Sequence, residues 1–186
     1  MVQDRWLPFI AVALSALVLG GFAWLVSGHA PAAGVGDPLP VLAATDLAGN
    51  RVSPEALSGQ VLLVNIWATW CGPCREEMPS IQALRDRFDG EGFEVVAISI
   101  DGGWDQERIR GRIGAFVEEV GLSFPVWHDP AGSSRRRLGT SGLPETFLVG
   151  ADGVIRERVV GAETWDDPRW IETIEALLQE VRDGRA

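Results

Sequence analysis

The sequence contains no lysine, and its 186 residues include only two cysteines and two histidines. Without lysine, Schiff-base chemistry on a lysine amine is excluded. The 16 basic residues are therefore all arginine, and 26 acidic residues outweigh them to give a formal net charge of −10. We expect no nucleic-acid partner, because such a partner requires a basic face.

Charge is absent from one long stretch near the N-terminus. Leu7 to Val26 is a run of twenty uncharged residues, about the length that a helix needs to cross a bilayer. Trp6 and Trp24 lie near its ends, where interfacial aromatic residues are favoured. We therefore expect an uncleaved transmembrane anchor over residues 7–27. The alternatives are a cleaved signal peptide, with Ala30-Pro31-Ala32 as the cleavage pattern, and a buried core helix.

The distribution of arginine predicts how this anchor is oriented. Arg5 precedes the span, and the next basic residue is Arg51, so the positive-inside rule leaves residues 1–6 as a cytoplasmic tail. The chain would then be a single-pass protein of the cell (inner) membrane. Residues 28–38, rich in Gly, Ala and Pro, are typical of a linker, here to a domain over residues 39–186 on the periplasmic or extracytoplasmic side.

The two cysteines stand together in the motif Trp70-Cys71-Gly72-Pro73-Cys74. The apolar, β-branched run 61–67 before it predicts a buried strand. After it, one face of a helix is apolar at 3.6-residue spacing. The cysteine pair therefore lies where a strand passes into a helix N-terminus. The apolar positions of this helix are Cys74, Met78, Ile81, Leu84 and Phe88.

A cysteine pair at a helix N-terminus indicates reversible thiol–disulfide chemistry. The unpaired N–H groups and partial positive charge there stabilise a thiolate, so Cys71 should be the low-pKa nucleophile. Cys74 lies one turn further in and is placed to resolve a mixed disulfide. A zinc site is a weak alternative, since only His29 and His128 could complete its ligands. The pair could also be a structural disulfide or two inert buried cysteines.

The remaining pattern predicts an α/β fold with a central mixed sheet flanked by helices. Pro79 falls inside the helix after the motif and should kink it. The one basic cluster, Arg135-Arg136-Arg137, reads as an exposed loop or helix end, with a docking patch as the alternative. The other expected elements are an edge strand over 39–44, a short helix capped by Ser53 and reaching Leu57, strands over 93–100, 124–127, 146–149 and 154–160, and helices over 108–120 and from Pro168, the last with an apolar stripe of Ile171, Ile174, Leu177, Leu178 and Val181.

Two segments of the chain resemble the thioredoxin superfamily. The first is residues 65–79, Asn65-Ile66-Trp67-Ala68-Thr69-Trp70-Cys71-Gly72-Pro73-Cys74-Arg75-Glu76-Glu77-Met78-Pro79, and the second is residues 142–147, Gly142-Leu143-Pro144-Glu145-Thr146-Phe147. More closely, the chain resembles the membrane-anchored TlpA-like and ResA-like thiol–disulfide oxidoreductases. That group includes the periplasmic reductants of cytochrome c maturation called CcmG or DsbE. The resemblance covers about residues 38–182 and implies a thioredoxin-like fold.

The resemblance assigns roles to residues beyond the two cysteines. Pro144 matches the family's cis-proline, with an ordinary turn proline as the alternative, and the Leu143 backbone would pair with an extended substrate. Trp70 and the 143–145 backbone would form the docking groove. Glu145 also fits the family, although a solvent-facing side chain explains it equally well.

Asn65 occupies the place where ordinary thioredoxins have a buried aspartate that helps to deprotonate the second cysteine. An amide cannot take that proton. Glu77 is the candidate replacement, because it matches an acidic residue of the ResA-like group and lies one turn beyond Cys74. The alternative is a glutamate favoured only by the helix dipole.

The resemblance implies a periplasmic reductant of protein disulfides that works through the Cys71/Cys74 dithiol without another cofactor. Apocytochrome c is the candidate substrate and a membrane thiol protein the candidate electron donor. Two different functions remain possible on the same fold. One is that of a Sco-like copper-delivery protein that would use both cysteines and His128, although a satisfied or exposed loop histidine explains His128 more simply. The second is that of a peroxidase.

Overall fold

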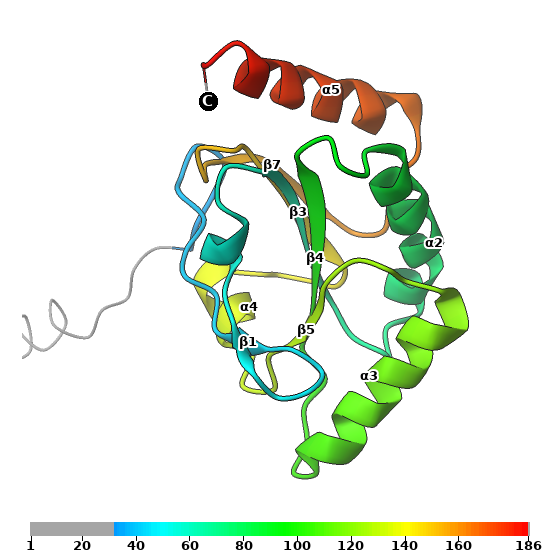
Figure 1. The fold of residues 1–186 in the computed structure, drawn as a ribbon. Coiled ribbons are helices and arrows are strands. Elements are labelled where there is room, and N and C mark those ends of the chain that lie inside the picture. The colour runs from blue at the N-terminus through cyan, green and yellow to red at the C-terminus, as the bar shows by residue number, and fades with distance from the viewer. Residues whose placement is uncertain (1–31, 186) are drawn as a thin grey trace, which may run out of the picture. The chain divides into compact units, whose positions relative to one another are not determined.

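The computed structural model describes residues 32–185 (Figure 1). The expected cytoplasmic tail, the anchor over 7–27, the start of the linker and His29 lie outside these residues. Within the described part, no helix combines the length and the apolar character needed to cross a membrane.

A seven-stranded mixed sheet forms the centre of this domain, in the order β2-β1-β5-β4-β3-β6-β7. β3, β4 and β5 are mutually parallel, whereas β6 pairs antiparallel with β3 and β7 antiparallel with β6. β3 is buried along its whole length, which explains its unbroken apolar run. The strands are β1 (Ala44–Thr45), β2 (Arg51–Val52), β3 (Val61–Trp67), β4 (Phe93–Ser99), β5 (Val126–His128), β6 (Glu145–Val149) and β7 (Ile155–Val160).

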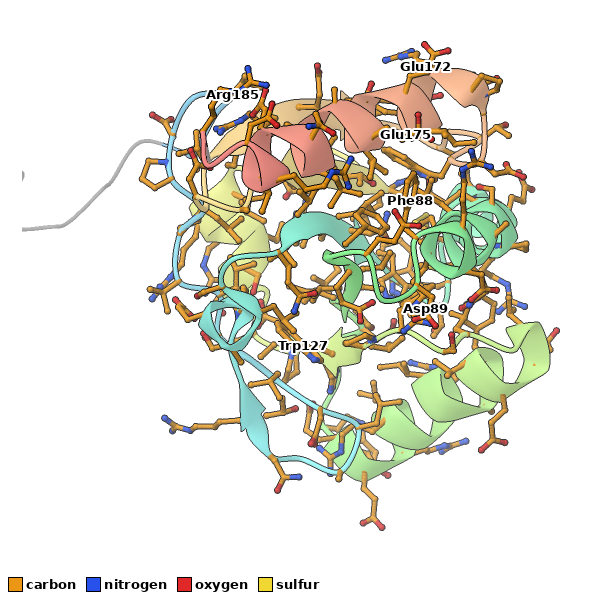
Figure 2. The ribbon with its side chains drawn as sticks, turned by 45° about the horizontal axis from the view of Figure 1, so that its top comes forward. Phe88, Asp89, Trp127, Glu172, Glu175 and Arg185 are labelled. Atoms are coloured by element: carbon orange, nitrogen blue, oxygen red, sulfur yellow. A yellow bond between two sulfur atoms is a disulfide. The ribbon has the colours of Figure 1, made fainter. Side chains whose placement is uncertain are left out.

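Helices cover both faces of the sheet, and the strands supply alternate side chains to the two cores (Figure 1). Leu63 of β3 contributes to the core under α2, α3 and α5, whereas Val64 contributes to the core on the opposite face, where Leu138 of α4 packs. At the end of α2, Phe88 is buried, and Figure 2 labels it together with Glu175 of α5. Arg87, the last residue of α2, contacts Glu175 at 3.4 Å. The helices are η1 (Pro54–Leu57, a 3₁₀ helix), α2 (Gly72–Arg87), α3 (Gln106–Val120), α4 (Ser133–Leu138) and α5 (Pro168–Arg182).

The structure confirms the main elements that the sequence predicts. The buried strand spans 61–67 as expected, and α2 begins directly after Cys71 and continues through Pro79. The long helices α3 and α5 lie within a few residues of their expected bounds. The two apolar runs around Gly150–Gly153 form the expected hairpin of β6 and β7.

Several local expectations are wrong. Ser53 makes no side-chain cap to η1. The edge strand expected over 39–44 is reduced to β1 (Ala44–Thr45), which lies between β2 and β5 and is therefore not at the edge of the sheet. Val181, assigned to the apolar stripe of α5, is 36% exposed and lies in the last turn of that helix. The short helix α4 is not among the expected elements, although its last turn does contain the three exposed arginines.

The domain also begins earlier than residue 39. Gly36 N donates to Ile155 O at 2.9 Å, and Ile155 N donates to Asp37 O at the same distance. Ala33 is buried in the core that α4 covers. The second half of the expected linker, 33–38, is therefore part of the domain, because its backbone pairs with the start of the edge strand β7.

Candidate active site

The cysteine pair lies at the N-terminus of α2, directly after the carboxyl end of β3. Cys71 occupies the N-cap position and its sulfur accepts a hydrogen bond from Cys74 N at 3.3 Å. The two cysteines form a disulfide with an S–S distance of 2.09 Å. Cys71 is 7% exposed and Cys74 is fully buried. Only Cys71 is therefore accessible to a partner sulfur, in the arrangement that the sequence predicts.

Gly72 and Pro73 form the first turn of α2, where proline is favoured because its missing N–H has no helical partner to lose. Both are exposed. Trp70 precedes the pair and is 67% exposed. The motif therefore presents an open indole surface beside a nearly covered sulfur.

A buried carboxylate holds the loop between β3 and the cysteines. Asp101 accepts hydrogen bonds from Thr69 N at 2.8 Å and from Thr69 Oγ1 at 2.5 Å, and another from Ser99 Oγ at 2.7 Å. Arg112 of α3 donates to the same carboxylate at 3.2 Å. Thr69 lies two residues before Cys71, so Asp101 fixes the backbone that leads into the active-site motif.

The loop before β6 lies at the same edge of the sheet. The Leu143–Pro144 peptide bond is cis, as the resemblance implies. Glu145 pairs with Ile66 of β3, which places the proline beside the end of that strand. Pro144 is buried and Leu143 is half-buried.

Glu77 lies on α2 one turn beyond Cys74 and is buried, with 2% of its surface exposed. Its Oε1 accepts a hydrogen bond from Asn65 Nδ2 at 2.7 Å. Its Oε2 accepts from Trp165 Nε1 at 3.0 Å and from Glu163 N at 3.2 Å. Burial raises the pKa of the Glu77 carboxyl above its ordinary value, although the hydrogen bonds from Trp165, Asn65 and Glu163 N oppose that shift.

Asn65 links Glu77 to the sheet. Its Nδ2 also donates to Thr146 Oγ1 at 2.8 Å, and Thr146 is its cross-strand neighbour on β6. Its Oδ1 is buried without a hydrogen-bond partner among the described residues. At the position where ordinary thioredoxins have an aspartate, this chain therefore has Asn65, which donates to Glu77. The acidic group is Glu77 on α2 instead.

Glu145 is fully buried, so the solvent-facing alternative for this residue is wrong. Its carboxylate pairs with Arg158 Nε of β7 and accepts from Ser141 N at 2.8 Å. Arg158 also donates to Gly139 O at 2.8 Å. This ion pair fastens the loop that leads to Pro144, because it ties both ends of that loop to β7.

His128 is not a loop residue, because it ends β5 and is fully buried. Its Nε2 lies 2.8 Å from Asp101 O, which satisfies one ring nitrogen. Within residues 32–185, no cluster of three or more His, Cys, Asp or Glu side chains is arranged to hold a metal ion. The structure therefore does not bring His128 together with the cysteines as a ligand set.

Three residues of the site are not predicted from the sequence. Asp101 directly follows the carboxyl end of the predicted strand 93–100. Functional residues are often found at that position in α/β sheets, so the sequence could have indicated Asp101 as a site residue. Arg158 lies two residues from the cross-strand partner of Glu145, so the register of the hairpin could have paired them. Nothing in the sequence marks Trp165, which lies in an irregular segment before α5.

Comparison with known proteins agrees with this geometry. Residues 35–158 match the AhpC/TSA family. The chain is 32% identical over 130 residues to the thiol–disulfide oxidoreductase ResA of Bacillus thuringiensis, covering 70% of this chain and 72% of that protein. It is 38% identical over 117 residues to ResA of Oceanobacillus iheyensis, covering 63% of this chain and 58% of that protein.

Solved structures share the fold. A crystal structure from Chlorobium tepidum, provisionally described as the thiol:disulfide interchange protein DsbE, matches with a TM-score of 0.66 at 29% identity and covers 81% of this chain and 99% of that one. StoA from Bacillus subtilis matches with a TM-score of 0.56 at 22% identity, over 76% of this chain and 98% of that one. The second similarity shows the fold alone.

Proposed function

Because this chain belongs to the AhpC/TSA family and is a thiol–disulfide oxidoreductase of the ResA type, we propose that it reduces protein disulfides. One observation carries the assignment of the reacting groups. The Cys71–Cys74 disulfide caps α2, with Cys71 7% exposed and Cys74 fully buried. Such an asymmetric pair separates an attacking thiolate from a resolving one.

The reaction begins with the reduced dithiol. The helix N-terminus stabilises the Cys71 thiolate, which attacks one sulfur of a substrate disulfide and displaces the other as a thiolate. The products are a mixed disulfide with Cys71 and one free substrate thiol, which takes a proton from water. The Cys74 thiolate then attacks the Cys71 sulfur and displaces the second substrate thiolate. Two electrons pass to the substrate, and the chain is left as the disulfide seen in the structure.

Glu77 is proposed to take the proton that Cys74 must lose before the second attack. Burial raises the pKa of the Glu77 carboxyl and so brings it closer to neutral pH. A carboxylate with such a pKa is a better general base than an exposed glutamate. Its position on the same helical face, one turn beyond Cys74, supports this role. Asn65 and Trp165 hold the carboxylate in place and do not themselves carry the proton.

The docking surface is proposed to lie between the exposed Trp70 and the 143–145 backbone, where an extended substrate would pair with Leu143. Apocytochrome c is the proposed substrate and a membrane thiol protein the proposed electron donor. The uncharged run over 7–27 supports an anchored protein whose redox domain faces the periplasm. The names of the relatives ResA and DsbE support the thiol–disulfide chemistry of this proposal.

A trapping experiment tests the chemistry. Full-length Cys74→Ser, reduced and mixed with a disulfide-bonded protein substrate, should accumulate a mixed disulfide because the resolving thiol is missing. The matched variant Cys71→Ser should trap almost nothing, since its remaining cysteine is buried. Equal trapping by both variants would contradict the assigned order of attack, and trapping by neither would contradict the function.

A further inference from the structure

The three arginines of the basic cluster have no acidic partner in the described part of the chain. Arg136 and Arg137 each donate through Nη1 to a backbone carbonyl, Arg136 to Ala131 O at 2.5 Å and Arg137 to Val41 O at 2.6 Å. Within residues 32–185, none of Arg135, Arg136 and Arg137 forms an ion pair with a carboxylate. In a chain of net charge −10, three adjacent unneutralised arginines require an explanation.

Arg135 and Arg136 line a pocket of about 530 Å³. Among the described residues, none that lines this pocket is acidic. The carboxylate nearest in sequence, that of Asp129, instead accepts hydrogen bonds from Ser133 Oγ at 3.1 Å and Ser134 N at 2.6 Å. The rest of the pocket is lined by Ile100, Pro130, Ala131, Gly132, Gly139 and Thr140.

Thr140 lines the same pocket, but its hydroxyl oxygen is shielded from solvent and has no hydrogen-bond partner in the described part of the chain. The donors that the pocket wall offers are therefore the two guanidinium groups, which are suited to a carboxylate.

The pocket opens at the edge of the sheet that carries the cysteine pair. Ile100 follows β4, and its N–H donates to Trp67 O at the end of β3, at 2.9 Å. Thr140 lies three residues before Leu143, whose backbone is proposed to pair with substrate. The pocket therefore lies at the same end of the sheet as the loop whose backbone is proposed to pair with substrate.

We propose that this pocket is an anion subsite that binds an aspartate or glutamate side chain of the protein substrate. Arg135 and Arg136 supply the charge, and Arg is suited to carboxylates because its planar guanidinium donates two parallel hydrogen bonds. The subsite would make the enzyme prefer disulfides with an acidic residue near the cysteine. The inference rests on the proposed function, since it assigns the occupant to the substrate of that reaction.

The preference for an acidic substrate is testable because it is opposite to the preference that the net charge of the chain predicts. A chain of net charge −10 repels acidic peptides in general, so bulk electrostatics favours a neutral substrate. We would measure reduction rates of disulfide peptides by the full-length reduced protein, placing either Glu or Gln at successive positions from the cysteine. At one position the Glu peptide should react about fivefold faster at low salt, and this preference should shrink in high salt.

In the double variant R135Q/R136Q that preference should disappear, so that the ratio of the Glu-peptide rate to the Gln-peptide rate falls to about one. R137Q removes the same kind of charge from the same helix but lies outside the pocket, and it should retain the preference. No Glu preference at any position, or an equal loss in R137Q, would overturn the subsite while leaving the reductase function intact.

Binding of cysteine-free Glu and Gln peptides to the oxidised protein separates the two proposals. Tighter Glu binding that R135Q/R136Q abolishes would support the subsite even if no peptide disulfide were reduced. Equal binding of both peptides, together with reduction of both at equal rates, would support the reductase and overturn the subsite.

Discussion

At the scale of single residues, the acidic group proposed to serve Cys74 lies on the helix α2, and the facing position on strand β3 carries an amide. Asn65 on β3 donates to Glu77 on α2, and Trp165 donates to the same carboxylate from a segment 88 residues away. The sequence points to Glu77 because the helix spacing places it one turn after Cys74. The contact with Trp165 depends on long-range packing, so local pattern cannot reveal it.

Glu77→Gln should slow disulfide exchange at neutral pH and remove one limb of the pH–rate profile. A flip of the Asn65 amide would turn its unpartnered Oδ1 toward the new Gln amide, so the variant can keep a hydrogen bond there. Stopped-flow reduction of a disulfide peptide across pH 5–9 measures the effect. A pH–rate profile identical to the wild type would argue against the proton-transfer role.

The same variant also carries a stability prediction. Burial raises the pKa of Glu77, so the folded chain binds this proton more tightly than the unfolded chain. The stability that Glu77 contributes is complete below its ordinary pKa of 4.5 and is lost as pH rises through the raised value. Denaturant unfolding of the oxidised proteins should therefore show wild type losing stability relative to Glu77→Gln above pH 4.5. A pH-independent difference would contradict the raised pKa.

Asp101→Ala should destabilise the fold by about 3 kcal/mol, because it leaves Thr69 N and Ser99 Oγ buried without an acceptor. It should also speed alkylation of Cys71 in the reduced protein, since the loop before the cysteine is released. Asp105→Asn, which keeps the N-cap of α3, serves as the control and should change stability by less than about 1 kcal/mol. A loss of stability with unchanged alkylation would limit Asp101 to a structural role.

At the scale of elements, sequence pattern predicts most of the strands and helices and fails where long-range pairing decides. The strand 61–67 and the long helices follow from apolar runs and 3.6-residue spacing, so their existence is visible locally. The burial of Glu145 is not visible locally, because a charged residue alone predicts an exposed position. The register of the hairpin brings Arg158 beside it and neutralises the buried charge. Residues 33–38 likewise read as a linker, since backbone pairing to the start of β7 leaves no side-chain pattern.

The stripe of α5 gives a prediction at this scale. Ile174→Ala should cost about 3 kcal/mol, because the side chain is buried in the core shared with α2 and α3. Val181→Ala, on the same predicted stripe but 36% exposed, should cost less than about 1 kcal/mol. Denaturant midpoints of the two oxidised variants measure the difference. Equal costs would show that the last turn of α5 packs more closely than the structure indicates.

At the scale of the whole molecule, three loops converge on one edge of the sheet. The cysteine motif follows β3, the Asp101 network follows β4, and the cis Leu143–Pro144 bond precedes β6. Parallel neighbouring strands end at the same edge, which is where ligands bind in open α/β sheets. The motif and the proline are visible in sequence because their residue types are distinctive. The supporting carboxylates, Asp101 and Glu145, are brought to the site by the sheet topology, which residue type alone does not indicate.

The direction of electron flow is the central claim, and the reduction potential of the Cys71–Cys74 couple tests it most directly. The full-length protein would be equilibrated in thiol–disulfide buffers and followed through the fluorescence of Trp70 beside the pair. A value near that of thioredoxin, about −270 mV, is the predicted result for a dedicated reductant. A value near that of DsbA, about −120 mV, would make the protein a disulfide donor and contradict the account.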